Sequence, residues 1–300
     1  MIPKLETIKG IVPVKSFAEY RELEGLNFHT LKDFCENPYR WSEGWFADNR
    51  PVGDALRIGT QAHELILQGE DVFAANNALW TPPVNPKTGE PYGVGTKAFK
   101  EALAAWEADN AGRRAYSVEE RAAFENMAAE LERNPAVTEV LRTPKEDGVY
   151  SEVAFCGEMV PFLTVKGSID RYDDEVGIVD LKTTGSLTEK FWKYDIWDRK
   201  YVQQLAFYQS ALMQIGNLDP DAYIQCYIVA VETGGQFRSA LLELDPEVMA
   251  AARAMVRQMI GKYLDAKMSM NYAGPYDGTI VIRTVRGRDP KEARKDIADG

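Results

Sequence analysis

Residues 149–184 decide the fold, and they read VYSEVAFCGEMVPFLTVKGSIDRYDDEVGIVDLKTT. Apolar and β-branched residues alternate or run together in three stretches of this segment, which are 149–156, 160–171 and 176–183. Such patterns are typical of β-strands. Turn-forming residues separate the stretches at Gly157-Glu158 and at 172–175. The segment therefore predicts three consecutive strands joined by tight connections.

Helical patterns surround these strands. Before them, helices are predicted at 30–36, 59–68, 97–110 and 117–133. After them come a helix over 198–215, a strand pair and a last helix, at 222–231, 237–244 and 245–268. Residues 1–25 read as an irregular arm, and the Pro- and Gly-rich stretch 81–95 reads as a mobile loop. This order predicts an α/β fold, a central mixed sheet flanked by helices.

The length of 300 residues suits one large domain or two modest ones. We predict a single domain over 1–300, with a mostly helical part at 1–140 and the sheet-bearing core at 145–270. The charged residues 283–300 are predicted to form a mobile tail.

The composition excludes several classes of protein. Hydrophobic residues make up 45% and charged residues 27%, values that exclude a disordered or fibrous chain. No run of eighteen apolar residues is present, so we expect no contact with a membrane, and the first residues lack a signal-peptide pattern. Three scattered cysteines indicate neither a disulfide framework nor a thiolate zinc site. We expect a cytoplasmic protein.

The formal charge is −11, from 35 Lys and Arg against 46 Asp and Glu. A net negative charge argues against a polyanionic partner, although it does not exclude a local basic groove or a bound cation. Basic residues do flank the strands described next; they are Lys166, Arg171, Lys190, Lys193, Arg199 and Lys200.

Two strand aspartates are the most informative residues. If the turn between their strands centres near Glu175, Asp170 and Asp180 lie opposite each other. Opposed carboxylates repel and normally share a proton or a cation, and a hard divalent ion such as Mg²⁺ or Mn²⁺ suits oxygen ligands. Lys182 would project beside that ion. A solvated strand face with alternating Asp and Lys explains the same three residues and stays open.

Four short motifs resemble the PD-(D/E)xK nucleases. Gly167–Arg171 with Ile178–Thr184 looks like the signature of these enzymes in its RecB/RecE-type form, in which GxxDR replaces the literal Pro-Asp. Gln204 and Tyr208 resemble the QxxxY helix that follows the catalytic lysine. Upstream, Gly59–His63 resembles the GxxxH helix.

The resemblance implies roles for individual residues. The implied catalytic residues are Lys182, Asp170, Asp180 and Glu152. The implied metal ligands are His63, Asp170, Asp180, the Leu181 carbonyl and Glu152. Supporting or DNA-binding positions are Gln204, Tyr208, Thr183 and Thr184, and the candidates for a 5′-phosphate are Arg40 and Arg57. Tyr39, Trp41 and Trp45 beside them are candidate DNA wedges or core residues.

From about residue 20 to about 265 the chain is similar to RecE-like phage exonucleases, the exodeoxyribonuclease VIII group. That resemblance implies a phage- or prophage-encoded exonuclease that degrades duplex DNA ends 5′ to 3′ with one or two Mg²⁺ ions, for which Mn²⁺ substitutes. It also implies a ring-shaped homo-oligomer and a RecT-like annealing partner.

Three alternatives remain. The first is a RecB-type single-strand nuclease or an endonuclease of the same fold; three unclustered cysteines disfavour its iron–sulfur branch. The second is a non-catalytic DNA-binding scaffold. The third is a hydrolase of small phosphoesters, which would not depend on polymer length.

Overall fold

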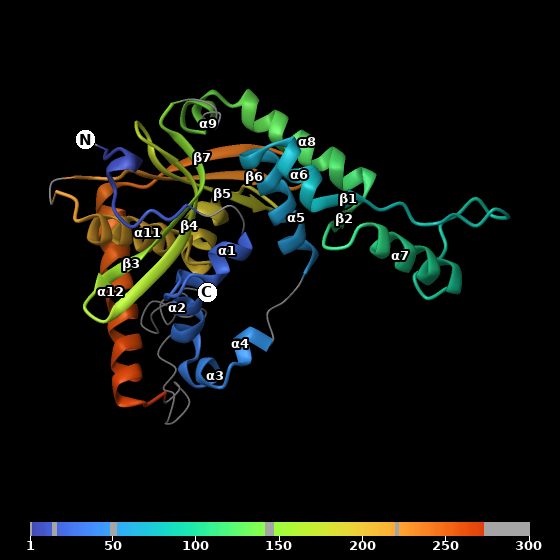
Figure 1. Cartoon of the computed structure of the whole chain (residues 1–300). Coiled ribbons are helices and arrows are strands. Elements are labelled where there is room, and N and C mark those ends of the chain that lie inside the picture. Colours follow the sequence, from blue (N-terminus) through green and yellow to red (C-terminus); the bar gives the residue numbers. More distant parts are fainter. Residues whose placement is uncertain (1, 14–16, 49–52, 142–146, 220–221, 273–300) are drawn as a thin grey trace, which may run out of the picture. The chain divides into compact units, whose positions relative to one another are not determined.

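The computed structural model describes residues 2–13, 17–48, 53–141, 147–219 and 222–272 (Figure 1). The chain divides into two compact units, Met1–Phe28 with Pro51–Arg257, and His29–Arg50 with Gln258–Gly300. The helical part predicted at 1–140 and the core predicted at 145–270 both contribute residues to each unit. The predicted tail at 283–300 lies outside the described residues.

A five-stranded sheet forms the centre of the first unit, in the order β3-β4-β5-β6-β7. Its strands are β3 (Val149–Val160), β4 (Leu163–Asp173), β5 (Gly177–Thr184), β6 (Cys226–Glu232) and β7 (Ser239–Glu243). Neighbours run antiparallel except β5 and β6, which are parallel. The predicted mixed sheet flanked by helices is confirmed.

The parallel pair requires a crossover, which the chain makes through helical segments. They are the π-helical turn η3 (Phe191–Asp195), α10 (Ile196–Asp198) and the long helix α11 (Tyr201–Gly216). The prediction of one continuous helix over 198–215 was wrong, because α10 ends at Asp198 and α11 begins at Tyr201. Lys200 takes a left-handed conformation, with φ 66° and ψ 26°, which ends α10 and lets α11 start in a new direction.

The first turn of the sheet also differs from its prediction. Gly157-Glu158 stays in β3, and the chain turns instead at Pro161 and Phe162. Proline has no N–H to lose from the ladder, and Phe162 takes a positive φ of 67°. The Phe162 N–H donates to the Glu158 carboxylate over 2.8 Å, so Glu158 stabilises the later turn.

Helices before β3 belong mostly to the first unit. They are η1 (Leu5–Thr7), α1 (Phe17–Glu22), α5 (Asp54–His63), the π-helical turn η2 (Glu64–Gln68), α6 (Glu70–Asn76), α7 (Lys97–Asp109), α8 (Val118–Arg133) and α9 (Pro135–Val140). Two short parallel strands, β1 (Asn77–Leu79) and β2 (Arg114–Tyr116), were not predicted. The expected loop at 81–95 contains turns and a bridge between Val84 and Pro91.

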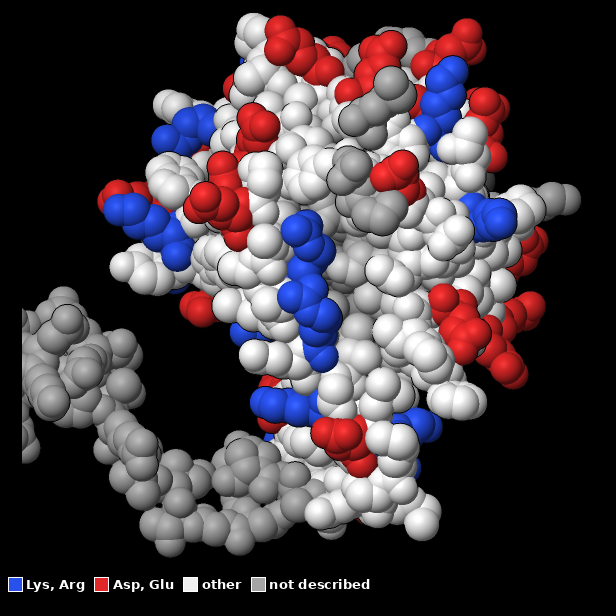
Figure 2. Space-filling view, turned by 90° about the vertical axis from the view of Figure 1, so that its left-hand side faces the viewer, with Lys and Arg blue, Asp and Glu red and all other residues white. Residues whose placement is uncertain are grey.

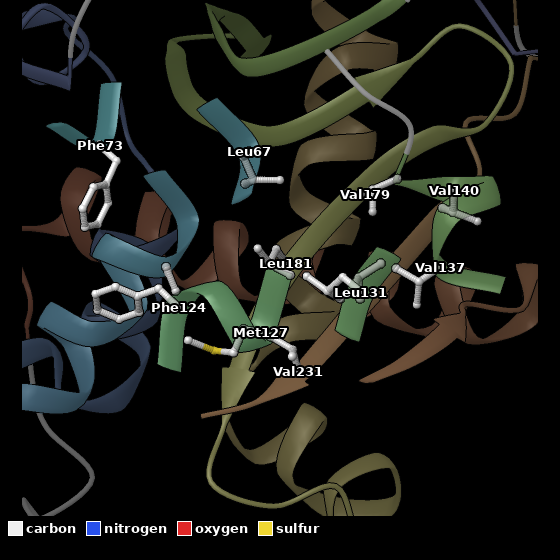
Figure 3. Packing of buried hydrophobic residues seen from close by; sticks show 12 residues of the cluster. Leu67, Phe73, Phe124, Met127, Leu131, Val137, Val140, Val179, Leu181 and Val231 are labelled. Atoms are coloured by element: carbon white, nitrogen blue, oxygen red, sulfur yellow. The ribbon is translucent and has the colours of Figure 1, made fainter. Parts of the chain in front are cut away.

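The main core lies between the sheet and the N-terminal helices of this unit (Figure 3). Val179 and Leu181 of β5 and Val229 and Val231 of β6 pack against apolar side chains of α5, η2, α6, α8 and α9. Each fully buried Leu or Val contributes about 1.5–3 kcal/mol. Helix α11 packs on β3, β4 and β5. Both contacts hold β5 in place, and β5 carries Asp180 and Lys182.

The second unit contains most of α2 (Phe28–Glu36), then α3 (Pro38–Ser42), α4 (Trp45–Asp48) and the end of α12 (Pro246–Ser269). Phe34, Trp41 and Tyr263 stack edge to face here, with ring centroids 5.2–5.6 Å apart. Trp41 is therefore a packing residue. No helix in the described ranges is long and apolar enough to cross a membrane.

Candidate active site

The β4–β5 hairpin brings the two aspartates to neighbouring positions. Arg171 pairs with Val179 in a hairpin centred on Glu175, so the next positions in register are Asp170 and Asp180. The strand pairing itself ends at Arg171 and Val179. The Asp170 side chain then reaches β5, and its Oδ2 accepts a hydrogen bond from the Leu181 N–H over 2.9 Å. The predicted register is confirmed.

Asp180 is buried, with 1% of its surface exposed. Its Oδ2 lies 2.7 Å from the Lys182 ammonium, which makes an ion pair by distance. Neither oxygen, however, has a well-aligned hydrogen-bond donor among the described residues. Burial raises the pKa of Asp180 to about 6, with Lys182 opposing this shift and Asp170 adding to it. The carboxylate therefore has less compensating positive charge than its burial demands.

Lys182 is surrounded by acidic groups. Burial alone would lower its pKa, but the carboxylates of Asp180 and Asp170 raise it above its usual value. The ring of Tyr201 lies under the ammonium, with 4.9 Å from Nζ to the ring centroid. Lys182 is therefore a fixed cation at neutral pH, which can stabilise negative charge but cannot accept a proton in this state.

His63 reaches the same place from the end of α5. Its Nδ1 lies 3.7 Å from Asp170 Oδ2, and the Leu181 main chain is near enough to oppose the lowering of its pKa. Burial, together with the Lys182 charge, lowers the pKa of His63 to about 4, so the ring is neutral and able to bind a metal. The π-helical turn η2 follows at once, and such turns often occur at functional sites.

Gly59 allows this approach of α5 to β5. A Cβ at this position would lie 3.2 Å from the Thr183 hydroxyl oxygen, a tight contact. The GxxxH spacing therefore has a steric meaning, because the glycine lets the helix lie against the strand that carries Asp180 and Lys182.

Glu152 lies beside Asp170, in β3. It falls between the register pairs Ser151–Arg171 and Val153–Ile169 and takes a positive φ of 51°. Its carboxylate accepts long hydrogen bonds from Ser168 (3.3 Å) and Gln68 (3.4 Å). Burial, then the Asp170 charge, raises the pKa of Glu152 to about 8. A strained glutamate that carries a proton at neutral pH is unusual in a structural strand.

Gln204 and Tyr208 lie together on α11. The Gln204 amide donates to the Tyr208 hydroxyl over 2.9 Å, and both side chains are buried. The Tyr208 ring packs on Phe155, with centroids 5.6 Å apart. A Cβ at Gly167 would lie 2.4 Å from Phe155 and 2.9 Å from Tyr208. The glycine of the GxxDR motif is therefore required for α11 to pack here.

The donor chemistry of the site suits a hard divalent cation. It includes the carboxylates of Asp170 and Asp180, the neutral imidazole of His63 and the Leu181 carbonyl. As these side chains stand, the described part of the chain has no group of three acidic, histidine or cysteine residues that already forms a metal site. Asp180 Oδ1, which is buried without a hydrogen-bond partner among the described residues, is the atom that most needs a cation.

A cleft of about 620 Å³ opens beside the site. His63, Thr60 and other residues of α5 line one side, and Lys182, Thr183 and Thr184 line another. Arg199, Tyr201 and Thr233 complete the lining. Within the described part of the chain, the charged residues that line it are the cations Lys182 and Arg199. A second hollow of about 450 Å³ shares Gly185 with this cleft, and the ion-paired Glu232 and Arg238 are among the residues that line it.

Sequence reasoning missed Tyr201 and did not place Arg199 in the site. Both stand directly before the QxxxY residues, a position that could have drawn attention to them. Thr183 and Thr184, which were predicted, line the cleft.

Arg57 occupies a different environment. Its guanidinium donates to Glu120, Gln61 and the Ala115 carbonyl and forms an ion pair with Asp54. These partners occupy it fully, so it is a structural arginine and a poor candidate for a 5′-phosphate.

The same network continues behind α5. Asn77, only 1% exposed, donates to Glu64 over 2.7 Å and to the Phe73 carbonyl over 2.8 Å, and it accepts from Gln61 over 3.0 Å. Arg114 pairs with Glu64 and donates to Asn77. We call this set of Arg57, Gln61, Glu64, Asn77, Arg114 and Glu120 the α5 polar network.

The predicted basic residues outside the cleft lie in different environments. The Lys166 ammonium is buried and donates to main-chain carbonyls of Tyr20, Arg21 and Leu23. In the second unit, Arg40 stacks on Trp45 at 4.6 Å. On the face drawn in Figure 2, the described Lys and Arg side chains are interspersed with Asp and Glu, so that face presents no broad basic surface. In the cleft, by contrast, Lys182 and Arg199 line the same hollow.

Comparison with known proteins shows the family and the fold. A family model described as "PDDEXK-like domain of unknown function (DUF3799)" matches residues 47–274. Among solved structures, a protein from Eubacterium rectale described as "Putative exonuclease" superposes with a TM-score of 0.55 at 17% sequence identity. That match covers 91% of this chain and 96% of the other, and it shows a shared fold. No curated protein sequence matches this chain.

Proposed function

This chain belongs to the PDDEXK-like domain family of unknown function (DUF3799), and from that premise we propose that it is a metal-dependent nuclease acting on DNA. One observation carries the proposal. Among the described residues, the cleft is lined by two cations and no carboxylate, and it opens beside a buried, under-compensated aspartate in a chain of net charge −11. That combination suits a phosphodiester held next to a divalent cation.

Each residue of the site has a separate role in the proposed reaction. Asp170, Asp180, His63 and the Leu181 carbonyl would hold Mg²⁺ or Mn²⁺, and Glu152 is available for a second ion. When bound, the ion supplies Lewis acidity and lowers the pKa of a water molecule. The Lys182 ammonium lies at the cleft wall, where it stabilises the charge that develops on the phosphate oxygens.

Gln204 and Tyr208 act through packing. Their mutual hydrogen bond and the contact of Tyr208 with Phe155 fix α11 against β3. Tyr201 begins that helix, so α11 also fixes the ring that lies under Lys182.

The finer proposal is a RecE-like exonuclease. It would degrade duplex DNA from its ends, 5′ to 3′, leaving 3′ single strands for recombination with a RecT-like annealing protein. It would act as a ring-shaped homo-oligomer in the host cytoplasm, encoded by a phage or prophage. The motif order of GxxxH, GxxDR, DxK and QxxxY supports this version, as does the "Putative exonuclease" with the same fold.

Digestion of linear duplex DNA with and without a 5′-phosphate, beside a closed circle, tests the proposal. With Mg²⁺ present we expect loss of the linear DNA, faster with the phosphate, and an intact circle. Nicking of the circle would instead indicate an endonuclease. If neither DNA is cleaved with Mg²⁺ or Mn²⁺, the protein is not a nuclease by itself.

A further inference from the structure

Positive charge accumulates where α11 begins. The N-terminus of a helix carries a partial positive charge and is normally stabilised by acidic side chains. The first turn of α11 contains none, and Arg199 and Lys200 come directly before it. Lys200 is also held in the left-handed conformation. Arg199 and Lys200 therefore add to the partial positive charge at the start of this 16-residue helix, and the Asp195 carboxylate, which interacts with Arg199, offsets part of it.

Arg199 is the residue of this group that lines the cleft. Its Nη1 donates to the Tyr201 hydroxyl over a long 3.4 Å, and in the described ranges it makes no ion pair with a carboxylate. The nearby lysines differ, since Lys190 pairs with Asp195 at 3.4 Å and Lys193 with Glu189 at 2.5 Å. The guanidinium of Arg199 is thus the cation with capacity for a further partner.

Tyr201 contacts both cations of the cleft. Its hydroxyl accepts from Arg199, and its ring lies under the Lys182 ammonium. One side chain therefore fixes the separation between the lysine of the active site and a second, exposed cation. Two positive charges that contact one side chain in the same cleft are suited to binding phosphates of a nucleic-acid strand, which fix its position on the protein.

We infer that Arg199 binds a substrate phosphate adjacent to the scissile one, and that Tyr201 is a positioning residue for Arg199 and Lys182. The inference rests on the proposed nuclease function and adds a specificity determinant to it. Arginine suits this role because its planar guanidinium donates two parallel hydrogen bonds to a phosphate. The partner is the phosphodiester backbone of a DNA strand.

Steady-state kinetics of Arg199→Ala test whether Arg199 binds a substrate phosphate. KM for a long DNA should rise about tenfold with a smaller change in kcat, because the lost contact lies outside the bond being broken. Arg199→Lys should recover part of the affinity. The matched control is Arg133→Ala, which removes a 73% exposed arginine of α8 and should leave both constants unchanged.

Binding measured without cleavage gives an independent readout. Fluorescence anisotropy with a labelled oligonucleotide in Ca²⁺ or EDTA compares wild type, Arg199→Ala and Arg133→Ala. Loss of one phosphate contact should lower the slope of log affinity against log salt by about 1 for Arg199→Ala alone.

Two substitutions of Tyr201 separate its two contacts. Tyr201→Phe keeps the ring under Lys182 and removes only the hydroxyl, so it should raise KM and add little to Arg199→Ala in the double variant. Tyr201→Leu removes the ring as well and should also lower kcat. Equal effects of Phe and Leu would contradict the positioning role.

The outcomes distinguish this inference from the proposed function. If the wild type cleaves DNA while Arg199→Ala matches Arg133→Ala in KM and in salt slope, the inference is wrong and the nuclease stands. If the wild type neither cleaves nor binds DNA, both are wrong.

Discussion

The active-site cleft and the α5 polar network contain similar residues in opposite states. In the network, each charge has a partner: Arg57 has Glu120 and Asp54, and Arg114 has Glu64. Beside the cleft, Asp180 Oδ1 lacks a hydrogen-bond donor within the described residues, and Arg199, which lines the cleft, has a long hydrogen bond to Tyr201 and a more distant interaction with Asp195. A satisfied network stabilises the fold. A site whose charged groups lack partners can still bind a ligand of opposite charge. Such charges are typical of functional sites.

Lys182→Ala should give the largest effect on activity. It removes the fixed cation of the cleft wall, so DNA cleavage should fall at least about a hundred- to a thousandfold. Folding and DNA binding should persist, since Arg199 and the α11 packing remain. Lys97→Ala, which removes an 88% exposed lysine, is the control and should cleave normally. Retained cleavage by Lys182→Ala would remove this lysine from the mechanism.

Asn77→Ala should give the largest effect on stability. It removes a buried amide that joins Gln61, Glu64, Arg114 and the Phe73 carbonyl. Each of these groups loses one buried hydrogen bond, which together should cost about 3 kcal/mol in the free energy of unfolding, measured with urea. Asn76→Ala is the control. Asn76 is exposed and makes one hydrogen bond to Glu64, so its loss should cost less than about 1 kcal/mol.

Asp180→Asn should separate stability from activity. Cleavage should be lost with the charge, yet at pH 7 the variant should be as stable as the wild type or about 1 kcal/mol more stable. The sign follows from the raised pKa of about 6: the folded state prefers the protonated carboxyl, so ionisation above pH 6 destabilises it. Asn Oδ1 can still accept from Lys182.

Unfolding curves at several pH values test this directly. The stability difference between Asp180→Asn and the wild type should shrink as the pH falls below 6 and vanish near pH 4. A large destabilisation at pH 7 would mean that Asp180 belongs to the structural class, with Asn77.

The sequence alone predicted those features of the fold and the site that depend on local patterns. The period of two and the β-branched residues of 149–184 predicted β3, β4 and β5, and the turn near Glu175 set the register that brings Asp170 and Asp180 to neighbouring positions. The GxxxH and QxxxY motifs predicted His63 and Gln204 as residues of the site.

The parts that depend on distant contacts could not be predicted. Strands β1 and β2 have three residues each, too few to show a period. Arg57 is paired by Glu120, 63 positions away, and no spacing rule relates the two. Arg199 lines the cleft because the crossover from β5 to β6 brings the start of α11 back to the end of β5, and this depends on the left-handed Lys200.

Glu120→Gln should give the smallest effect, and its pH dependence should run opposite to that of Asp180→Asn. Arg57, by hydrogen bonding, lowers the pKa of Glu120, so the ionised form stabilises the folded state. This stabilisation is complete above the unfolded value of about 4.3 and is lost as the pH falls through the lower, folded value.

The two side chains of that pair are 28% and 24% exposed, so solvent screens their interaction and the loss at pH 7 should be about 1 kcal/mol. Glu125→Gln, at a 59% exposed partner of Arg121, should lose less than this. If the cost of Glu120→Gln shrinks on acidification while the advantage of Asp180→Asn also shrinks, the two charges act with opposite sign on one fold. A network glutamate that behaved like Asp180 would remove the distinction between a satisfied structural charge and an uncompensated functional one.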